Sequence, residues 1–510
     1  MSNPNPLAPP APAPRWFVLL GVLALVGYGI FLGVNSTVAA GGSDSSGYLN
    51  SARLLAAGQL DTTVRIPRGF GDFTNLFGPN FQPLGFLAST DSSRMVPSYP
   101  TGFPLHLALA GKIIGWTAGP LCVGLAGALA AVALCYLVGR ELGLDWTLAA
   151  AATVVLAACP ILLFTSIQPL SDTLATAWCL AAVLGALRAR RHAGWAAVCG
   201  AAYAVAVLVR PTNLVLLPAL IAFIGFDVRR LALAALAGLP AAAWLAFYNH
   251  TVYGGAFRSG YPAIETAFAA SYVAPTASHF LHWLTVFLPA VLLGLPFVAL
   301  VHRATRTRHL LGLALWFAPI VTVYLFYAIS HEAWTCLRFI LPALPALIIG
   351  GMLGVDALAR FRPGAGVARF RAVAAVMLGA WAVIAAWRWA PPHAVFYTKR
   401  YEDAYTAACL AARTQLPKNA LVVSCYASGA VHYYTDFAIL RWDHLTTTAQ
   451  FADYAATAQR VGIPLCAVLF ASEEEDVFTR HCPGNWQRLA TVSGVGLWQL
   501  AAGPAGAATK

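Results

Sequence analysis

The chain of 510 residues is 59% hydrophobic and only 10% charged, with a mean hydropathy of +0.68. Soluble domains carry about a quarter charged residues, so this composition excludes an ordinary soluble protein and predicts a polytopic α-helical membrane protein. The net charge of +12 does not indicate nucleic-acid binding, because the basic residues fall in short loops between apolar runs, where anionic lipid and membrane topology explain them.

The N-terminal segment predicts an uncleaved membrane anchor. Residues 1–14 are rich in Pro and Ala and are expected to form a disordered cytoplasmic tail. The apolar run Trp16–Val38 is longer than the core of a signal peptide, and Arg15 is the only basic residue before it. Arg15 places the N-terminus in the cytoplasm. Residues 39–102 then become the first outer loop of a transmembrane domain that covers 15–390.

The first outer loop carries an acidic residue where a helix is expected to begin. The stretch Gly41–Leu60 contains Asp44, and apolar residues follow it at helical spacing. This pattern predicts an amphipathic helix on a membrane surface or on top of a helix bundle. One interpretation is that Asp44 caps the helix by accepting backbone hydrogen bonds. The other is that Asp44 is a catalytic base facing a lipid-borne substrate, and the stretch alone leaves both open.

The remaining apolar segments are ordered by the positions of the arginines. Phe103–Trp116 is short for a span and is expected to lie in the outer interface; as a tilted span it would invert the topology downstream. With the interfacial choice, the arginines collect in five inner loops, and about eleven transmembrane helices result. The ten that follow the anchor are expected at 119–138, 148–164, 173–187, 194–209, 214–226, 231–248, 280–301, 310–329, a segment that ends near Arg360, and 372–390.

The segment 391–510 differs in character and predicts a C-terminal α/β domain on the outer side. Polar helical stretches at 401–416 and 446–462 alternate with apolar strand-like runs at 420–424, 437–441, 465–470 and 494–500. The acidic run Glu473–Asp476 is expected to be a solvated helix start. Four cysteines would meet an oxidising compartment, so disulfides and buried free thiols both stay open for Cys409, Cys425, Cys466 and Cys482.

Ionisable residues gather at the predicted outer ends of the spans, where they are costly and therefore candidates for function. Arginine forks match phosphate oxygens and stabilise charge on a phosphate leaving group, whereas a carboxylate can take a proton from an attacking hydroxyl or amine. Together they indicate group transfer from a lipid phosphate to a nucleophilic acceptor. The alternative is that each arginine has only a structural role, either extending its side chain to the lipid headgroups or forming an ion pair within the protein.

The order of these features resembles the GT-C-fold glycosyltransferases that use polyprenyl-phosphate sugars. This superfamily includes the protein O-mannosyltransferases, the lipid A aminoarabinose transferase and RgtA/B/C/D-like bacterial proteins. The resemblance covers most of the chain in the right order. Its pieces are SDSSGYLNSARLLAAGQL, YPTGFPLHLAL, QPLSDTLATAW, RPTN, YNHTVYGGAFRSGY, LRFILPALP and the outer α/β domain.

The resemblance implies a multi-span fold with its site in a cavity at the outer face, and an inverting transfer without a metal cofactor. By this resemblance Asp44 is the catalytic base and Asp172 a supporting acidic residue, while Arg210, Arg258 and Arg338 hold the donor phosphate. The sequence departs from the paired acids of some branches, since a serine follows Asp44, and a metal would need further carboxylates there. Further candidates for substrate binding are Tyr48, Tyr99, His106, Tyr261, His331 and Glu332.

The expected partners are a polyprenyl-phosphate-linked sugar, a glycan, lipid or protein acceptor, and membrane lipids. The expected location is a bacterial inner membrane, with the active site and the C-terminal domain on the periplasmic or extracellular side. Two alternatives remain: a transporter or flippase of a lipid-linked saccharide, and a non-catalytic membrane scaffold. A transporter is disfavoured because its polar site would lie near the midplane within repeated halves.

Overall fold

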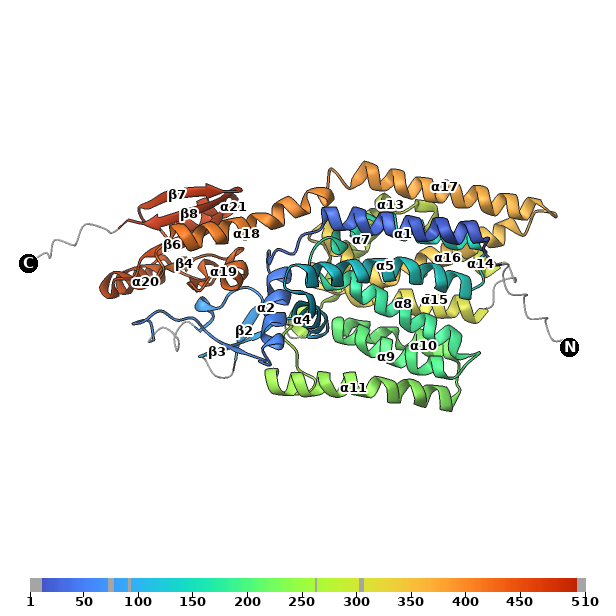
Figure 1. The fold of residues 1–510 in the computed structure, drawn as a ribbon, viewed down its shortest axis with the longest axis horizontal. Helices are drawn as coiled ribbons and strands as arrows, with labels where there is room; N and C mark the ends of the chain where they lie inside the picture. Colours follow the sequence, from blue (N-terminus) through green and yellow to red (C-terminus); the bar gives the residue numbers. More distant parts are fainter. Residues whose placement is uncertain (1–11, 72–77, 90–92, 262–263, 302–306, 502–510) are drawn as a thin grey trace, which may run out of the picture. The chain divides into compact units, whose positions relative to one another are not determined.

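The computed structural model describes residues 12–71, 78–89, 93–261, 264–301 and 307–501, which form two compact units (Figure 1). Unit 1 consists of Met1–Ser36, Leu121–Leu245 and Pro262–Tyr397, and unit 2 of Thr37–Pro120, Ala246–Tyr261 and Thr398–Lys510.

Unit 1 is entirely helical among its described residues apart from an isolated bridge. Its elements are α1 (Arg15–Asn35), most of α5 (Ala118–Glu141), α6 (Trp146–Ala158), α7 (Pro160–Ser166), α8 (Ser171–Ala189), α9 (Gly194–Val209), η2 (Pro211–Leu216), α10 (Leu217–Ile224), most of α11 (Val228–Tyr253), α12 (Ile264–Ala267), η3 (Ala270–Tyr272), α13 (Val273–Phe287), η4 (Ala290–Leu293), α14 (Leu295–Val301), α15 (Thr307–Leu325), η5 (Ala328–His331), η6 (Trp334–Ala343), α16 (Leu344–Ala359), α17 (Gly366–Trp389) and η7 (Val395–Tyr397).

The exposure of these helices separates a central layer from lipid-facing ones. Only 6% of the apolar windows of α1 and α11 is buried, against 83% for α8 and 89% for the segment Trp334–Ala359. A helix that is apolar all round and exposed needs lipid around it, whereas α8 and α16 bury their side chains in protein. The protein is therefore a polytopic membrane protein.

Seven helices in the described part of the chain are long and apolar enough to cross a membrane, and an eighth span results if α6 and α7 are joined. These two helices meet at a 60° bend. Pro160 begins α7 and cannot donate a backbone hydrogen bond to α6, which explains the break. Shorter apolar helices at Gly194–Val209 and Pro211–Ile224 lie where two further spans were predicted; the total of about eleven stays a prediction.

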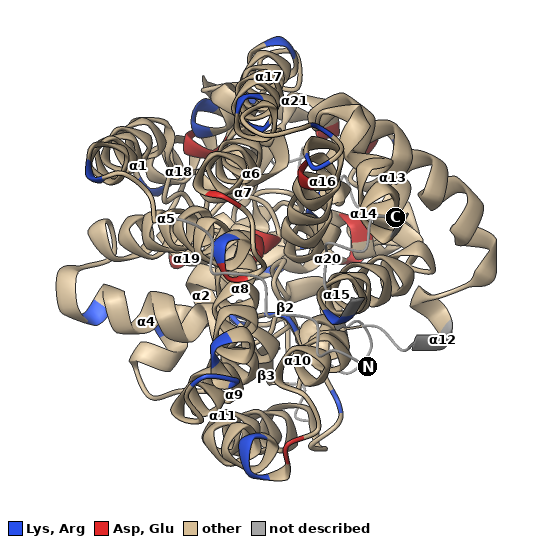
Figure 2. Cartoon of the chain, turned by 90° about the vertical axis from the view of Figure 1, so that its right-hand side faces the viewer, with Lys and Arg blue, Asp and Glu red and all other residues tan. Residues whose placement is uncertain are grey.

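Residues of three predicted inner loops of unit 1 lie close together at one end of its helices. Arg188 Nε lies 2.8 Å from Glu141 Oε1, and Arg191 pairs with the same carboxylate. Arg190 and Arg308 line a cavity of about 190 Å³ together with Glu141. Figure 2 looks along the helices and shows Lys and Arg at the ends of several of them. The assignment of this end to the cytoplasm stays a prediction.

Unit 2 combines the first outer loop with the C-terminal segment. Its elements are α2 (Asp44–Ala56), β1 (Thr62–Thr63), η1 (Gly78–Phe81), β2 (Phe86–Ala88), β3 (Arg94–Pro97), α4 (Gly102–Ile114), α18 (Thr398–Gln415), β4 (Leu421–Val423), α19 (Ser428–Tyr434), β5 (Ala438–Leu440), η8 (Trp442–His444), α20 (Thr448–Val461), β6 (Leu465–Phe470), α21 (Ala471–Asp476), η9 (Val477–His481), β7 (Trp486–Val492) and β8 (Val495–Leu500), with the end of α11.

The larger sheet of unit 2 has the strand order β5-β4-β6-β8-β7, and a small antiparallel sheet has the order β1-β3-β2. β4 runs parallel to β5 and β6, whereas β8 is antiparallel to β6 and β7. Side chains alternate along β6: Leu465, Ala467 and Leu469 enter one core, and Cys466 and Val468 enter the core on the other face. A strand buried on both faces reads as a continuous apolar run, as this one does.

The core that contains Leu465, Ala467 and Leu469 explains why the first outer loop and the C-terminal segment form one unit. Phe70, Phe81, Phe86 and Met95 of the first outer loop pack against the β4–β6 face, while α18 covers the opposite face. The predicted boundary at residue 390 stays a prediction. The contacts group the C-terminal segment with 37–120 and 246–261, because aromatic residues of the loop need the sheet to be buried.

Secondary structure in the C-terminal segment mostly follows the sequence pattern. The four predicted strands and two predicted helices are present, but α19 and β7 were not predicted. The prediction of a solvated acidic run is wrong at Glu473, which is buried and accepts hydrogen bonds from Phe470 N (2.9 Å) and Trp442 Nε1 (2.9 Å). Of the open alternatives for the cysteines, the structure has buried free thiols at Cys409, Cys425, Cys466 and Cys482.

Candidate active site

Asp44 lies in the first turn of α2, directly after Ser43 at the N-cap position. The Tyr99 hydroxyl donates a hydrogen bond to Asp44 Oδ1 over 2.6 Å, and Ser43 Oγ lies 2.7 Å from the same phenol oxygen. Asp44 is half-buried, and the positive end of the helix dipole favours its negative charge. The carboxylate is therefore held in one orientation at the start of a helix.

The tyrosine that bonds to Asp44 is itself part of a packed group of aromatic side chains. The Tyr48 ring is buried, with its centroid 4.8 Å from the Tyr99 ring and 5.0 Å from Phe103 on α4. Burial, and next the Asp44 carboxylate beside it, raise the pKa of Tyr99 well above its usual value. The phenol therefore stays protonated and acts as the donor to Asp44. Of the predicted site residues, Asp44, Tyr48 and Tyr99 are brought together.

A second carboxylate, which sequence reasoning missed, lies against the segment before Asp44. Glu402 is in the first turns of α18, and its Oε2 is buried without a hydrogen-bond partner among the described residues. A Cβ atom at Gly41 would overlap this oxygen, so the carboxylate lies directly against the glycine backbone. Next to it, Thr37 Oγ1 donates a hydrogen bond to Asp403 Oδ1 over 2.5 Å. The start of α18 is thus packed onto the chain that leads to Asp44.

Glu402 titrates near neutral pH. Burial, then the negative charges of Asp44 and Asp403, raise its pKa to about 7. An acid with this pKa can hold or release a proton beside Asp44 at physiological pH. The signal that could have found it is the acidic pair Glu402–Asp403, which follows the last predicted span on the same predicted side as Asp44.

We predict that Glu402→Gln removes a pH dependence of stability. A carboxyl whose pKa is raised on folding binds its proton more tightly in the folded state, so its stabilising contribution is present below pH 4.5 and is lost as pH rises through about 7. The Gln variant should therefore be more stable than wild type at pH 8, by roughly 1–3 kcal/mol. Thermal unfolding between pH 4.5 and 8 measures this. Glu475→Gln, at an exposed carboxylate of unit 2, is the matched control, and equal pH profiles for wild type and Glu402→Gln would contradict the prediction.

The end of α11 and the loop after it contact the end of β3 and the residue that follows, directly before Tyr99. The Tyr253 hydroxyl donates to Pro97 O over 2.7 Å, and a Cβ atom at Gly260 would overlap Ser98 O. Arg258 and Tyr261 on this loop are exposed. The structure therefore fixes the loop next to the Tyr99 segment and leaves both side chains accessible to a ligand.

In unit 1, Asp172 and Arg210 form a buried ion pair. Asp172 is in the first turn of α8, and its side chain is 4% exposed against 13% for Arg210. Arg210 NH2 also donates to the Tyr324 hydroxyl over 3.2 Å, and Thr212 Oγ1 lies 2.7 Å from that hydroxyl. Most of the charge of Arg210 is thus balanced within the protein.

The other predicted site residues each have separate contacts in the structure. Arg338 is half-buried on η6, with its guanidinium carbon 5.4 Å from the Phe339 ring centre. His331 Nδ1 lies 3.2 Å from Thr276 Oγ1, whereas Glu332 is exposed. In unit 2, His106 Nδ1 lies 2.7 Å from Gly102 O within α4. Within the described ranges no group of three His, Cys, Asp or Glu side chains could hold a metal ion; transfer without a metal stays a prediction.

Known structures with the same architecture cover almost the whole chain. ArnT from Cupriavidus metallidurans bound to undecaprenyl phosphate aligns over 96% of this chain and 100% of its own, with 16% identity and a TM-score of 0.56. The apo oligosaccharyltransferase of Archaeoglobus fulgidus aligns over 91% of this chain and 71% of its own, with 13% identity and a TM-score of 0.51. Both proteins are GT-C glycosyltransferases. The chain has the GT-C fold.

A third GT-C structure, the arabinofuranosyltransferase AftD from Mycobacteria, aligns over 97% of this chain but 42% of its own, with 12% identity and a TM-score of 0.51. The chain spans less than half of that protein. No protein-family model and no curated protein sequence matches the chain. The GT-C resemblance predicted from the motifs is confirmed, and at these identities it establishes the fold.

Proposed function

We propose that this protein is a membrane glycosyltransferase that moves a sugar from a polyprenyl-phosphate donor to an acceptor at the outer face of a bacterial inner membrane. The observation that carries the proposal is the Asp44 carboxylate, oriented by Tyr99 at the start of α2, in a chain with the GT-C fold. The ArnT structure, described as bound to undecaprenyl phosphate, supports the donor class because it matches this chain over its full length.

Asp44 acts as general base. It takes the proton from an acceptor hydroxyl or amine as that atom attacks the anomeric carbon of the sugar. The bond between this carbon and the phosphate oxygen breaks, and the electron pair leaves with the polyprenyl phosphate. Attack from the face opposite the phosphate inverts the anomeric centre. Tyr99 keeps the base in position throughout, because its own proton stays on the phenol.

Arginines stabilise the phosphate as it leaves. Arg338 is the principal candidate in unit 1, because Arg210 is already paired with Asp172 and serves mainly to position its surroundings. Arg258 in unit 2 is exposed and suited to a donor or acceptor anion. In this assignment Asp172 is a positioning residue for Arg210.

The proposal predicts that undecaprenyl phosphate stabilises the purified protein. A ligand that binds only the native state adds about 2.7 kcal/mol of stability at 100 times its Kd. Loss of the charged hydrogen bonds of Arg338 should weaken binding by about tenfold or more, so Arg338→Ala should show a smaller rise in Tm. Thermal unfolding of detergent-solubilised protein with increasing undecaprenyl phosphate measures both effects.

Arg369→Ala is the matched control, because Arg369 is exposed near the start of α17 in a predicted inner loop. It should respond to the lipid like wild type. No stabilisation of folded wild-type protein would contradict the donor assignment. Movement of a sugar-lipid across liposomes without any acceptor would favour the flippase alternative.

A further inference from the structure

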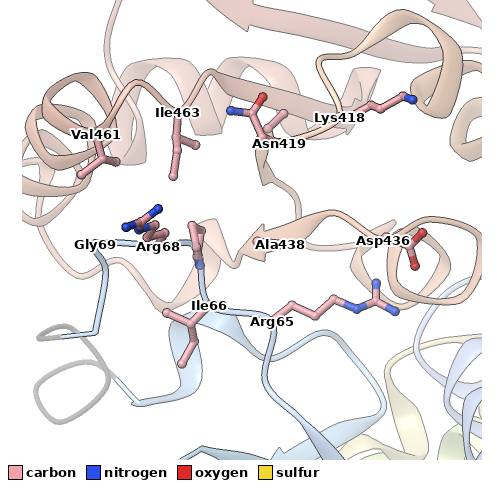
Figure 3. A pocket seen from close by; sticks show the side chains of 12 residues that line it. Arg65, Ile66, Arg68, Gly69, Lys418, Asn419, Asp436, Ala438, Val461 and Ile463 are labelled. Carbon is pink, nitrogen blue, oxygen red and sulfur yellow. The ribbon is translucent and has the colours of Figure 1, made fainter.

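Two adjoining cavities of unit 2 are not lined by Asp44. The first has a volume of about 640 Å³ and lies between the loop 65–69 and the C-terminal sheet (Figure 3). The second, of about 370 Å³, includes side chains of α2 and α19. Arg65 and Asp436 line both, so the two cavities meet at these residues. We name the pair the basic groove.

The described residues that line the basic groove include five basic side chains and one carboxylate. Arg65, Arg68 and Lys418 line the first cavity. Arg53 and Arg413 line the second, together with Arg65. His432 adds no charge, because burial lowers its pKa to about 3. A concave surface with an excess of positive charge attracts anions.

Two of the arginines are held in place by the fold. Arg65 NH1 donates to Thr435 O over 2.7 Å and NH2 to His432 O over 3.2 Å, near the C-terminal end of α19. Arg53 NH1 donates to Tyr433 O over 2.8 Å, with its guanidinium carbon 3.4 Å from the centre of that ring. Less conformational entropy is then lost when a ligand binds.

The first cavity also offers what a saccharide needs besides charge. Ile66, Val461 and Ile463 form an apolar wall, and a Cβ atom at Gly69 would lie 2.6 Å from Val461 Cγ1, so the loop closes tightly on that wall. Figure 3 shows the Arg65 side chain extended toward Asp436, which can accept hydrogen bonds from hydroxyl groups. Apolar walls with a few polar groups, in a volume of roughly 300–1,000 Å³, are typical of small-ligand sites.

The groove is separate from the Asp44 site. Arg53 comes nine positions after Asp44, which places the two on opposite faces of α2 at 100° per residue. Asn50, which lines the second cavity, is six residues from Asp44, or about 9 Å along the helix axis. A chain of a few sugar rings can bridge this distance, whereas the phosphate of the donor cannot occupy both places.

We propose that the basic groove binds an anionic saccharide, a glycan that carries phosphate or carboxylate groups. Arginine forks bind either group through paired hydrogen bonds. Resting on the proposed glycosyl transfer, this ligand is the acceptor, and the groove holds it at a distance from the residue that reacts.

Binding can be tested without transfer. Isothermal titration of the full-length protein in detergent would use hexagalacturonate as the carboxylate probe, glucose 1-phosphate as the phosphate probe and maltohexaose as the neutral control. We expect one or both anionic probes to bind more tightly than maltohexaose, and added salt to weaken them. Arg68→Glu and Lys418→Glu reverse charges on exposed side chains of the groove and should each raise Kd about tenfold.

Arg480→Glu is the matched control, since Arg480 is exposed in unit 2 and lines neither cavity. Asp44→Asn should bind the probes like wild type even where transfer is lost, which separates a failure of this proposal from a failure of the transferase assignment. The proposal is overturned if neither anionic probe binds, if maltohexaose binds equally, or if the groove variants bind like wild type.

Discussion

Asp44→Asn is expected to lower the rate of sugar transfer by roughly 10²- to 10⁴-fold, the usual contribution of a general base. Asparagine has nearly the same shape and can still accept the hydrogen bond from Tyr99, so α2 and its aromatic support should be retained. What is lost is the ability to take a proton from the acceptor. The expected phenotype is therefore a folded, membrane-inserted protein without turnover.

The measurement is the release of polyprenyl phosphate from polyprenyl-phosphate-linked hexoses in the presence of a cell-envelope extract that supplies acceptors. Asp453→Asn, which removes an exposed carboxylate on α20, controls for the general loss of negative charge and should be fully active. Melting temperatures of both variants test folding. Normal turnover by Asp44→Asn would remove Asp44 from the catalytic role.

Arg210→Ala is expected to destabilise the protein by about 3–5 kcal/mol, because it leaves the buried Asp172 carboxylate without its partner. The side chain of Asp172 is only 4% exposed, so water cannot replace the guanidinium. The Tyr324 hydroxyl loses a donor as well. This effect is structural and should be present without any substrate.

A double variant that removes both charges separates this pair from a direct role in donor binding. Asp172→Asn combined with Arg210→Gln removes both charges and should recover much of the stability lost in Arg210→Ala. Arg229→Ala, at an exposed arginine of α11, should change stability little. If Arg210→Ala melts like wild type while undecaprenyl phosphate no longer stabilises it, Arg210 binds the donor phosphate rather than positioning its neighbours.

Several features were predictable because their cause is local in sequence. The apolar run Leu465–Phe470 was predicted to be a strand, and it is β6, which the structure buries on both faces. The long apolar run after Arg15 gave α1, since about 20 apolar residues span a bilayer. Asp44 was singled out because an acidic residue at a helix start beside hydrocarbon is costly to place there without a use.

The partners of these residues were not predictable. Glu402 contacts Gly41, in the segment before Asp44. The sequence around Glu402 gives no sign of this contact, and neither does the sequence around Gly41. Glu473 was predicted to be part of a solvated acidic run. It is buried instead, and it accepts hydrogen bonds from the Trp442 side chain and the Phe470 backbone. Arg210 was predicted to hold the donor phosphate, and its ion pair with Asp172 of another helix was not predicted.

The sequence by itself predicted the membrane class, the main apolar segments, four of the five strands of the C-terminal sheet and Asp44 as a candidate, because hydropathy, side-chain periodicity and the cost of a charge near lipid act over a few residues. Only the tertiary structure decided that the first loop packs on the C-terminal sheet, that Tyr99 holds Asp44 while Asp172 occupies Arg210, and that five basic side chains form one groove. These contacts join segments far apart in the chain, such as Asn50 with Gly429, and depend on how complete elements pack, which local patterns do not contain.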